Sequence, residues 1–597
     1  AAKLRMSVSS MVENQSPDGP RRLTVIGLLV LLLTMVFVQL FVTFRGLSSP
    51  AAMDSAQLAR ELTLGHGFHT KVVRPSSWRQ HLAKVGDDPV ASLREVAQPP
   101  LPALVLAPIF GLLHRHYAYK GQTRVYLLDR VTATVAIFFF LGALGVTYVT
   151  ARRLFDAWVA GWMVLCVLLC QFAWDVARSG LAPAMAMFFV ALALNALAAA
   201  LERNADGERA TLGQALTVGL ACALLVVTHG LAAWVVPGLA LAWAIWVRQR
   251  WLLFVVLLLP AMTVGGWAWW QMSVAHEPFS AARTVLQAAL AYGSDAWLWR
   301  DFSGATPPVD LATLALKSLG NLIEQCRNFP ALYGGAVPAL LFLPALLHPF
   351  RKVETRAFRW ALLVTWLGAV LGMAIVGLPE MELDDRQVHF LFLPLFAAFG
   401  FAFLAIFWAR LFGQRTHWWA RHGAAAVATV LSAMPMLHTL PNEMAFGLST
   451  TDRMAHWPPY LPDRIAKLRT FTAEDEVIFS DVPWAVAWYA DRRAVWLPLR
   501  LEDLAAMREQ LRKHGESSAG ILITPLSAKG KVPGDVFRDS YANWSPLVFR
   551  GYGLGLGVDT LSALPDFPFR EFLPMAGQPV GDRFIAEMAF FSDRRRW

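Results

Sequence analysis

Long apolar runs, separated by short basic or polar stretches, fill most of the chain up to residue 440. Roughly 20 apolar residues form a helix long enough to cross the hydrocarbon core of a bilayer. About eleven runs approach that length, so the pattern predicts a polytopic α-helical membrane protein with about 11 transmembrane helices. The predicted spans are 23–44, 131–149, 157–174, 183–201, 212–228, 231–247, 252–271, 333–347, 360–378, 388–409 and 423–440.

The basic clusters between the runs predict which helix ends lie in the cytoplasm. Arg21 and Arg22 stand before the first run, and Arg152 and Arg153 follow the run at 131–149. Short loops rich in Lys and Arg stay on the cytoplasmic side of a membrane. This rule predicts a cytoplasmic tail at 1–22 and a transmembrane domain at 23–440. Within that domain it predicts two outer loops, at 45–130 and 272–330.

One short apolar run, at 101–113, does not fit this alternation. It follows two prolines and contains two more, Pro102 and Pro108. Counting it as a span would place every later basic cluster on the outer side, against the rule for basic loops. We therefore predict a juxtamembrane segment that lies along the outer surface.

Residues 441–597 have a different pattern. Charged residues become more frequent, and the apolar runs shorten to the length of strands, with Pro and Gly between them. The segments 477–479 and 520–523 are typical of buried strands, and 501–514 has the apolar spacing of a helix. Alternating strands and helices predict a soluble extracytoplasmic α/β domain at 441–597.

Composition supports a membrane protein and excludes several other classes. Hydrophobic residues make up 56% of the chain and charged residues only 16%, and the mean hydropathy is +0.44. The net charge of +10 is concentrated in the clusters between apolar runs, so it does not predict nucleic acid as a partner. The four cysteines have neither metal-ligand spacing nor the pattern of a disulfide framework.

The first candidate for chemistry is Asp54, in the sequence MDSAQLARELTLGHGF at 53–68. On the predicted topology this carboxylate lies just outside the membrane. Asp54 and Gln57 also have the spacing of a capping box, in which both side chains bind the first turn of a helix that would end at Gly65. Both interpretations stay open, because one carboxylate can cap a helix and also face a cavity.

Three further groups of polar residues fall on the predicted outer side. One is Asp175 with Arg178, another is the run EMELDDRQVH at 380–389, and the third is the charged loop 272–330. Each group also has a structural alternative. Asp175 and Arg178 could be an interfacial charge pair, 380–389 a solvated turn, and the charges of 272–330 merely solvated. A dense charged run between two spans more readily faces a cavity than open solvent, which favours a functional role for 380–389.

The order of these motifs resembles a known family. Asp54 is followed by A-x-x-L-x-x-G-x-G-F, then by PPL before an apolar run, Arg130 at the start of the next helix, and RRLF at 152–155. Late in the chain, Asp385 and Arg386 are followed by Phe390 and Pro394. Over roughly residues 20–410 this resembles the GT-C membrane glycosyltransferases, in the branch of the protein O-mannosyltransferases and the lipid A aminoarabinose transferase.

The resemblance implies transfer of a sugar from a polyprenyl-phosphate donor on the outer face of a bacterial cytoplasmic membrane. Asp54 corresponds to the family's first-loop Asp, which acts as general base or orients the acceptor. The acceptor would be a membrane lipid, a glycan or a protein. By the same resemblance and by position, the donor phosphate would be bound by Arg386, Arg178 and His389, and the cavity would be lined by Asp175, Glu382 and Asp385.

The sequence also departs from the family pattern. Asp54 is followed by Ser55, where relatives commonly have Asp-Glu, and 178–183 has no carboxylate where a second acid is usual. Asp175 could take the place of that acid, and a divalent cation stays open as a cofactor. The departures leave an alternative function: a catalytically silent GT-C scaffold, present as one subunit of a larger membrane complex.

Overall fold

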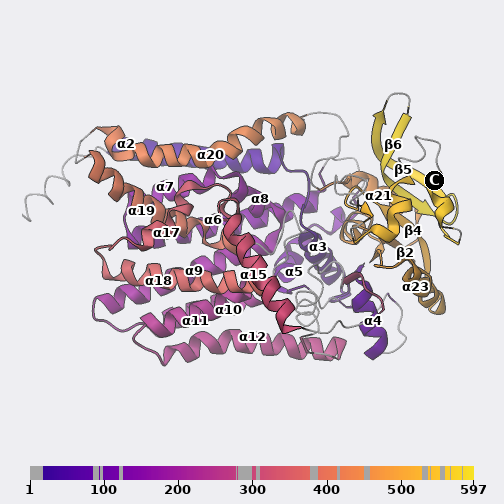
Figure 1. Ribbon diagram of the computed structural model, residues 1–597, viewed down its shortest axis with the longest axis horizontal. Coiled ribbons are helices and arrows are strands. Elements are labelled where there is room, and N and C mark those ends of the chain that lie inside the picture. Colours follow the sequence, from indigo (N-terminus) through magenta and orange to yellow (C-terminus); the bar gives the residue numbers. More distant parts are fainter. Residues whose placement is uncertain are drawn as a thin grey trace, which may run out of the picture.

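The computed structural model describes most of the chain, with the bundle of helices at one end and a β-sheet at the other (Figure 1). The described residues are 18–84, 90, 93–94, 98–119, 125–276, 278–279, 299–303, 310–376, 388–412, 417–448, 458–527, 536–537, 540–550, 559–564, 566–580 and 583–597. The predicted polar run 380–387, including Glu382, Asp385 and Arg386, lies outside them.

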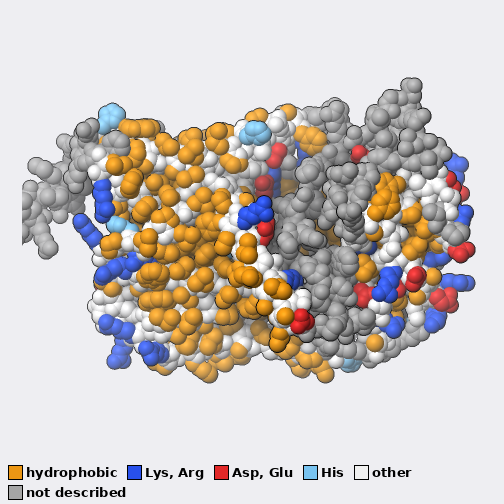
Figure 2. All heavy atoms as spheres, in the orientation of Figure 1, with side chains coloured by type: hydrophobic (Ala, Val, Ile, Leu, Met, Phe, Trp, Pro, Cys, Tyr) orange, Lys and Arg blue, Asp and Glu red, His pale blue; other side chains and the backbone are white. Residues whose placement is uncertain are grey.

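The bundle consists of long apolar helices whose outer surface is mainly hydrophobic (Figure 2). Within the described ranges, six helices are long and apolar enough to cross a membrane, or seven if α7 and α8, which are bent by 67°, form one broken span. The chain is therefore a multi-pass membrane protein. The bundle helices are α2 (Asp18–Phe37), η1 (Val38–Val42), α6 (Leu127–Leu154), α7 (Ala157–Leu168), α8 (Gln171–Ser179), α9 (Leu181–Ala205), α10 (Leu212–Val226), α11 (Val235–Trp246), α12 (Leu252–Ala275), α18 (Val353–Ile375), α19 (Leu393–Phe412) and α20 (Trp418–Leu448).

One of the predicted spans, 333–347, is wrong as a continuous helix. The chain there forms three short pieces, η5 (Ala331–Tyr333), α16 (Val337–Leu340) and α17 (Phe342–Leu346). Gly334 and Gly335 adopt positive φ angles of 60° and 70°, a conformation that ends a helix. Pro338 and Pro344 then remove backbone donors that a continuous helix would need.

Lys and Arg side chains gather at the end of the bundle that lies away from the sheet (Figure 2). Neighbouring loops contact each other there: Lys352 Nζ donates to the carbonyl of Arg153 at 3.0 Å, and Arg153 pairs with Glu202 at 3.0 Å. Basic clusters that the sequence places between alternate spans thus meet at one end. The cytoplasmic location of that end stays a prediction.

The sheet contains six strands in the order β1-β3-β2-β4-β6-β5. Neighbours from β1 to β4 are parallel, and β6 pairs antiparallel with both β4 and β5. The strands at 477–479 and 520–523 and the helix at 501–514 are confirmed. The elements are β1 (Val72–Val73), β2 (Glu476–Ser480), β3 (Arg493–Trp496), β4 (Ser517–Ile523), β5 (Glu571–Val580), β6 (Arg583–Ser592), α21 (Pro462–Phe471) and α23 (Leu501–Lys513).

The edge strand β1 comes from the segment 45–130, which the sequence predicts as the first outer loop. Val72 and Val73 pair in parallel with Ala494 and Val495 of β3. One buried apolar cluster also extends from the bundle helices through the first loop to Trp488. The C-terminal part is therefore joined to the first loop by a shared sheet and a shared core.

Three helices lie between the bundle and the sheet, and a fourth crosses the bundle obliquely (Figure 1). α5 has 12 residues, or about 18 Å, which is shorter than the roughly 30 Å of a hydrocarbon core. It packs against α3, which supports the predicted juxtamembrane position. The fourth helix shows that part of the predicted loop 272–330 is helical. The four are α3 (Pro50–Thr63), α4 (Pro75–Lys84), α5 (Leu101–Leu112) and α15 (Leu311–Arg327).

Candidate functional site

Asp54 lies inside α3, where its side chain is only 4% exposed. The capping-box interpretation is therefore wrong. The helix begins at Pro50, after the N-cap Ser49, because proline has its φ angle already fixed near the helical value and suits the first helical position. The predicted end is confirmed: the C-cap is Leu64, and Gly65 follows with φ +84°.

One face of α3 contacts the segment that contains β1. Asp54, Gln57 and Glu61 share this face, because positions i, i+3 and i+7 are neighbours on a helix. Asp54 Oδ2 pairs with Arg74 Nη2, and Gln57 Oε1 accepts the backbone N–H of Lys71 at 3.2 Å. Lys71 Nζ lies 2.9 Å from Glu61 Oε1. Lys71 and Arg74 flank β1, so α3 is fixed to the edge of the sheet.

Arg74 provides the positive charge beside Asp54. The two side chains are 10% and 4% exposed, so the pair is almost completely removed from water. The Arg74 guanidinium also lies over the Trp299 ring, 5.3 Å from its centroid. No sequence signal identified Arg74, because it follows Asp54 by 20 positions in a loop without periodicity.

The interpretation that the charges of loop 272–330 are solvated is wrong for the segment 299–303. Arg300 is fully buried. Its guanidinium donates to the carbonyls of Leu497 at 2.6 Å, Ser540 at 2.8 Å and Pro498 at 3.2 Å. Trp299, under Arg74, is thus held next to an anchor in the C-terminal part.

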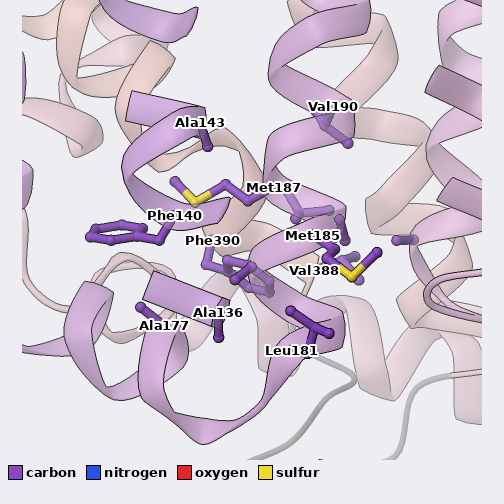
Figure 3. Packing of buried hydrophobic residues seen from close by; sticks show 14 of the residues in the cluster. Ala136, Phe140, Ala143, Ala177, Leu181, Met185, Met187, Val190, Val388 and Phe390 are labelled. Atoms are coloured by element: carbon purple, nitrogen blue, oxygen red, sulfur yellow. The ribbon is translucent and has the colours of Figure 1, made fainter. Parts of the chain in front are cut away.

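Among the described residues, one small cavity lies between α3 and the bundle, and a second lies inside the bundle, among α6, α8, α9 and α19. Figure 3 shows the packing of buried hydrophobic residues around the second, with Phe140 on α6, Met187 on α9 and Phe390 on η6 (Val388–Phe392). The first is lined by Ser49, Ala51, Ala52, Ser55, Leu106, Thr132, Gly180, Leu181, Ala182 and Pro183, and the second by Phe140, Ala173, Val176, Ala177, Ala184, Met187, Phe390 and Leu393. The second is lined by apolar side chains alone, and at about 10 Å³ it is far too small to hold a hydrocarbon chain.

Arg178 forms the centre of a polar cluster at the end of α8. Its guanidinium lies 2.6 Å from Asp175 Oδ1 and 3.4 Å from Glu443 Oε2, and it donates to Thr43 Oγ1 at 2.7 Å. Gln171 donates to the same two carboxylates, at 2.9 and 3.4 Å. The Asp175–Arg178 pair is confirmed as an ion pair. Sequence reasoning missed Glu443, which belongs to α20 and is distant in the chain.

α3 touches the start of α9 at Ala52 and Gly180. A Cβ atom at Gly180 would lie 2.5 Å from the Cβ of Ala52. Ala52 precedes Asp54 by two positions, and Gly180 follows Arg178 by two. Only glycine permits this approach, and it closes one side of the first cavity, whose lining includes neither Asp54 nor Arg178. Asp54, two positions from Ala52 on the helix, lies on another face of α3.

His389 lies within the bundle and is 1% exposed. Its Nδ1 accepts from Trp366 Nε1 at 3.0 Å, and its Nε2 lies 3.0 Å from Gln325 Oε1. These partners connect η6 with α18 and α15. These contacts do not test the predicted role of His389 in binding phosphate, which stays a prediction.

The described residues contain no group of three or more His, Cys, Asp or Glu side chains arranged to hold a metal ion. Asp54 pairs with Arg74, while Asp175 and Glu443 pair with Arg178. These three carboxylates of the described residues already have cationic partners, so they do not offer free ligands to a divalent cation.

Membrane helices, a loop after the first of them that holds a buried carboxylate, and a C-terminal α/β sheet together give the chain the GT-C fold, the fold that the sequence resemblance implied. No family model and no curated protein sequence matches the chain.

Two solved structures of ArnT from Cupriavidus metallidurans match over 95% of this chain and 98% of theirs. The apo state has a TM-score of 0.54 at 13% identity, and the form bound to undecaprenyl phosphate has 0.50 at 12%. The Archaeoglobus fulgidus oligosaccharyltransferase, in complex with Zn and sulfate, matches over 85% of this chain and 69% of its own, with a TM-score of 0.50 at 13% identity. At identities this low, the structural matches establish the fold alone.

Proposed function

We propose that the chain is a membrane glycosyltransferase that moves a sugar from a polyprenyl-phosphate donor to an acceptor on the outer face of a bacterial cytoplasmic membrane. The fold supports this function, and one ArnT structure of that fold is bound to undecaprenyl phosphate. The basic end of the bundle would face the cytoplasm, and the sheet would lie outside.

The observation that carries the proposal is the buried Asp54 on α3, paired with Arg74 at the edge of the sheet. In the reaction, an acceptor hydroxyl would give its proton to Asp54 while its oxygen bonds to the anomeric carbon of the sugar. The bond from that carbon to the phosphate oxygen breaks, and the polyprenyl phosphate leaves. A base must come within hydrogen-bond reach of the proton it takes.

Arginines would stabilise the negative charge on the leaving phosphate, because a guanidinium binds phosphate oxygens in pairs. Arg178, two positions before Gly180, is the candidate among the described residues, and Arg386 is proposed from the sequence. Phosphate bound at Arg178 would compete with Asp175 and Glu443 for the guanidinium. The acid cluster would then set how tightly the donor phosphate is held.

The test is a transfer assay with purified protein in liposomes that contain radiolabelled polyprenyl-phosphate hexoses and pentoses, offered with lipid, glycan and peptide acceptors. We expect Asp54→Asn to lower the transfer rate by roughly 100-fold or more, the range for loss of a general base. Gel filtration and the unfolding temperature check that the variant folds. Full activity in folded Asp54→Asn protein would remove Asp54 from the chemistry.

A second candidate function is the scaffold, and one observation favours it. Asp54, Asp175 and Glu443 are all in ion pairs, as they would be in a fold retained for its shape. A scaffold predicts that the protein purifies in a fixed ratio with other membrane subunits and that Asp54→Asn leaves the phenotype of the cell unchanged. Transfer by the isolated protein would contradict it.

A further inference from the structure

A short segment of the C-terminal part, residues 486–491, inserts among the helices beneath the sheet. It comprises the π-turn η7 (Val486–Ala490) and Asp491, and all of η7 is buried. Trp488 Nε1 and the Tyr489 hydroxyl both donate to Asp129 in the first turn of α6, at 2.6 and 2.9 Å. We call residues 486–491 the docking segment. It fixes the C-terminal part to a membrane helix.

The same segment holds α3 through Arg60. The Arg60 side chain is 1% exposed, and it donates to the carbonyls of Trp488 at 3.0 Å and Ala487 at 2.8 Å. Its Nη2 also lies 2.9 Å from Asp491 Oδ1. Three contacts to one guanidinium leave little freedom for α3 to rotate or slide against the docking segment.

Asp491 joins two cations of the first loop. Lys71 Nζ lies 2.6 Å from Asp491 Oδ1 and 2.9 Å from Glu61 Oε1, so Asp491 contacts both α3 and the residue before β1. Asp491 adopts a left-handed backbone conformation, with φ +55°. That conformation is unfavourable for most residues, although Asp and Asn tolerate it better. Such a conformation persists where surrounding contacts hold it, often at functional positions.

We propose that the docking segment is the positioning element for Asp54, and that Asp491 is its central positioning residue. The proposal rests on the proposed catalytic role of Asp54. Arg60 and Asp54 belong to one 14-residue helix and are six positions apart, or about 9 Å along its axis. A helix this short moves as a rigid unit, so its orientation at Arg60 sets the direction of the Asp54 carboxylate.

The charge of Asp491 is suited to this role. Burial alone would raise the pKa of Asp491, but Arg60 and Lys71 outweigh burial, and the net pKa is lowered. The carboxylate thus stays ionised at neutral pH and keeps both contacts. Misplacement of a reacting group by about 1 Å can lower a rate by roughly 100-fold, so a small rotation of α3 would be visible in the rate.

The experiment compares Asp491→Asn with Asp559→Asn in the transfer assay. Asparagine keeps the shape of the side chain and its tolerance of the left-handed conformation, and removes only the charge. We expect Asp491→Asn to lower kcat by about 10- to 100-fold with the donor KM unchanged. Asp559, which pairs with Arg550 at 2.5 Å on the exposed surface of the C-terminal part, is the matched control and should leave both constants unchanged.

A double variant separates positioning from an independent effect. If Asp491 acts through Asp54, Asp491→Asn should cause no further loss in a protein that already has Asp54→Asn. An equal loss in both backgrounds would overturn the proposal. Should Asp491→Asn fold poorly, Arg60→Lys tests the same link, because lysine keeps the charge but cannot make the three contacts.

Hydrogen exchange distinguishes failure of this proposal from failure of the proposed function. Asp491→Asn should speed amide exchange in 52–64, the α3 region, by about 10-fold or more, whereas Asp559→Asn should not. This result does not depend on any transfer activity. Unchanged exchange in α3 would overturn the positioning role, even if the wild-type protein proved to be an active transferase.

Discussion

The Asp54 carboxylate is paired with Arg74, the residue that directly follows the edge strand β1. Because Lys71, just before the same strand, contacts Gln57 and Glu61, the charged face of α3 lies along one edge of the sheet. The candidate base is therefore attached to the edge of the C-terminal sheet. Variants of the sheet edge should change the membrane site.

Arg74→Met should destabilise the protein strongly. It removes the counter-charge of a carboxylate that is 4% exposed, and breaking a buried ion pair from one side typically costs about 3–5 kcal/mol. Thermal unfolding in detergent would measure the loss. Asp54→Asn combined with Arg74→Met should recover most of it, because no buried charge remains. A double variant as unstable as Arg74→Met would contradict the coupling.

Gly180→Ala should push α3 away from the start of α9. The new methyl group would lie 2.5 Å from the Cβ of Ala52, far inside van der Waals contact. Overpacking of this kind usually costs about 1–3 kcal/mol, and here we also expect reduced transfer. Adding Ala52→Gly restores the space and should recover stability and activity. Gly213→Ala, at an exposed helix start without a close side-chain clash, is a control.

Asp481 predicts a pH dependence of stability. It is fully buried at the end of β2, and burial raises its pKa to about 6, although Thr524 donates two hydrogen bonds to it. The pKa is higher folded than unfolded, so its stabilising contribution is complete below about pH 4 and is lost as pH rises through about 6. The loss amounts to about 3 kcal/mol.

Asp481→Asn should remove this dependence, because asparagine accepts the Thr524 bonds without ionising. The variant should match the wild-type protein near pH 4 and exceed its stability at pH 7 to 8, measured as unfolding free energy in detergent. Glu61 and Asp491 have lowered pKa values and contribute the opposite slope in both proteins. Identical pH profiles of the two proteins would refute the assignment.

Arg300→Met should detach the segment 299–303 from the C-terminal part. Methionine fills similar space but leaves the carbonyls of Leu497, Pro498 and Ser540 without this donor, at a cost of about 3 kcal/mol or more. Because Trp299 lies under Arg74, transfer should fall as well. Limited proteolysis near residue 300 would detect the detachment. The same change at exposed Arg327 should have no effect on either measurement.

The sequence was sufficient for features that depend on local pattern. The spans at 131–149, 183–201 and 252–271 fall within helices long enough to cross a membrane, because length and apolarity alone determine them. Strands at 477–479 and 520–523 followed from short buried runs. The pair Asp175 and Arg178 was visible because its members lie one helical turn apart.

Features that depend on distant contacts could not be predicted in this way. Arg74, Glu443 and Asp491 acquire their roles from partners brought close only by folding, and nothing in their neighbourhoods marks them. The start of α3 was misplaced for another reason. Pro50 begins the helix earlier than the polar residue Asp54 suggested, because a proline needs no backbone donor at the first helical position.

The pairing of β1 with β3 also determines the order in which parts of the chain can fold during synthesis. Lys71 and Asp491 are 420 positions apart, so at synthesis rates of about 5–20 residues per second the first loop is made roughly 20–80 s before its partner exists. During that interval the edge segment at 72–73 has no strand to join, and Arg60 lacks its partners in the docking segment. If the proposed function holds, α3 would therefore reach its final position, and Asp54 its active one, only after the C-terminal part has folded.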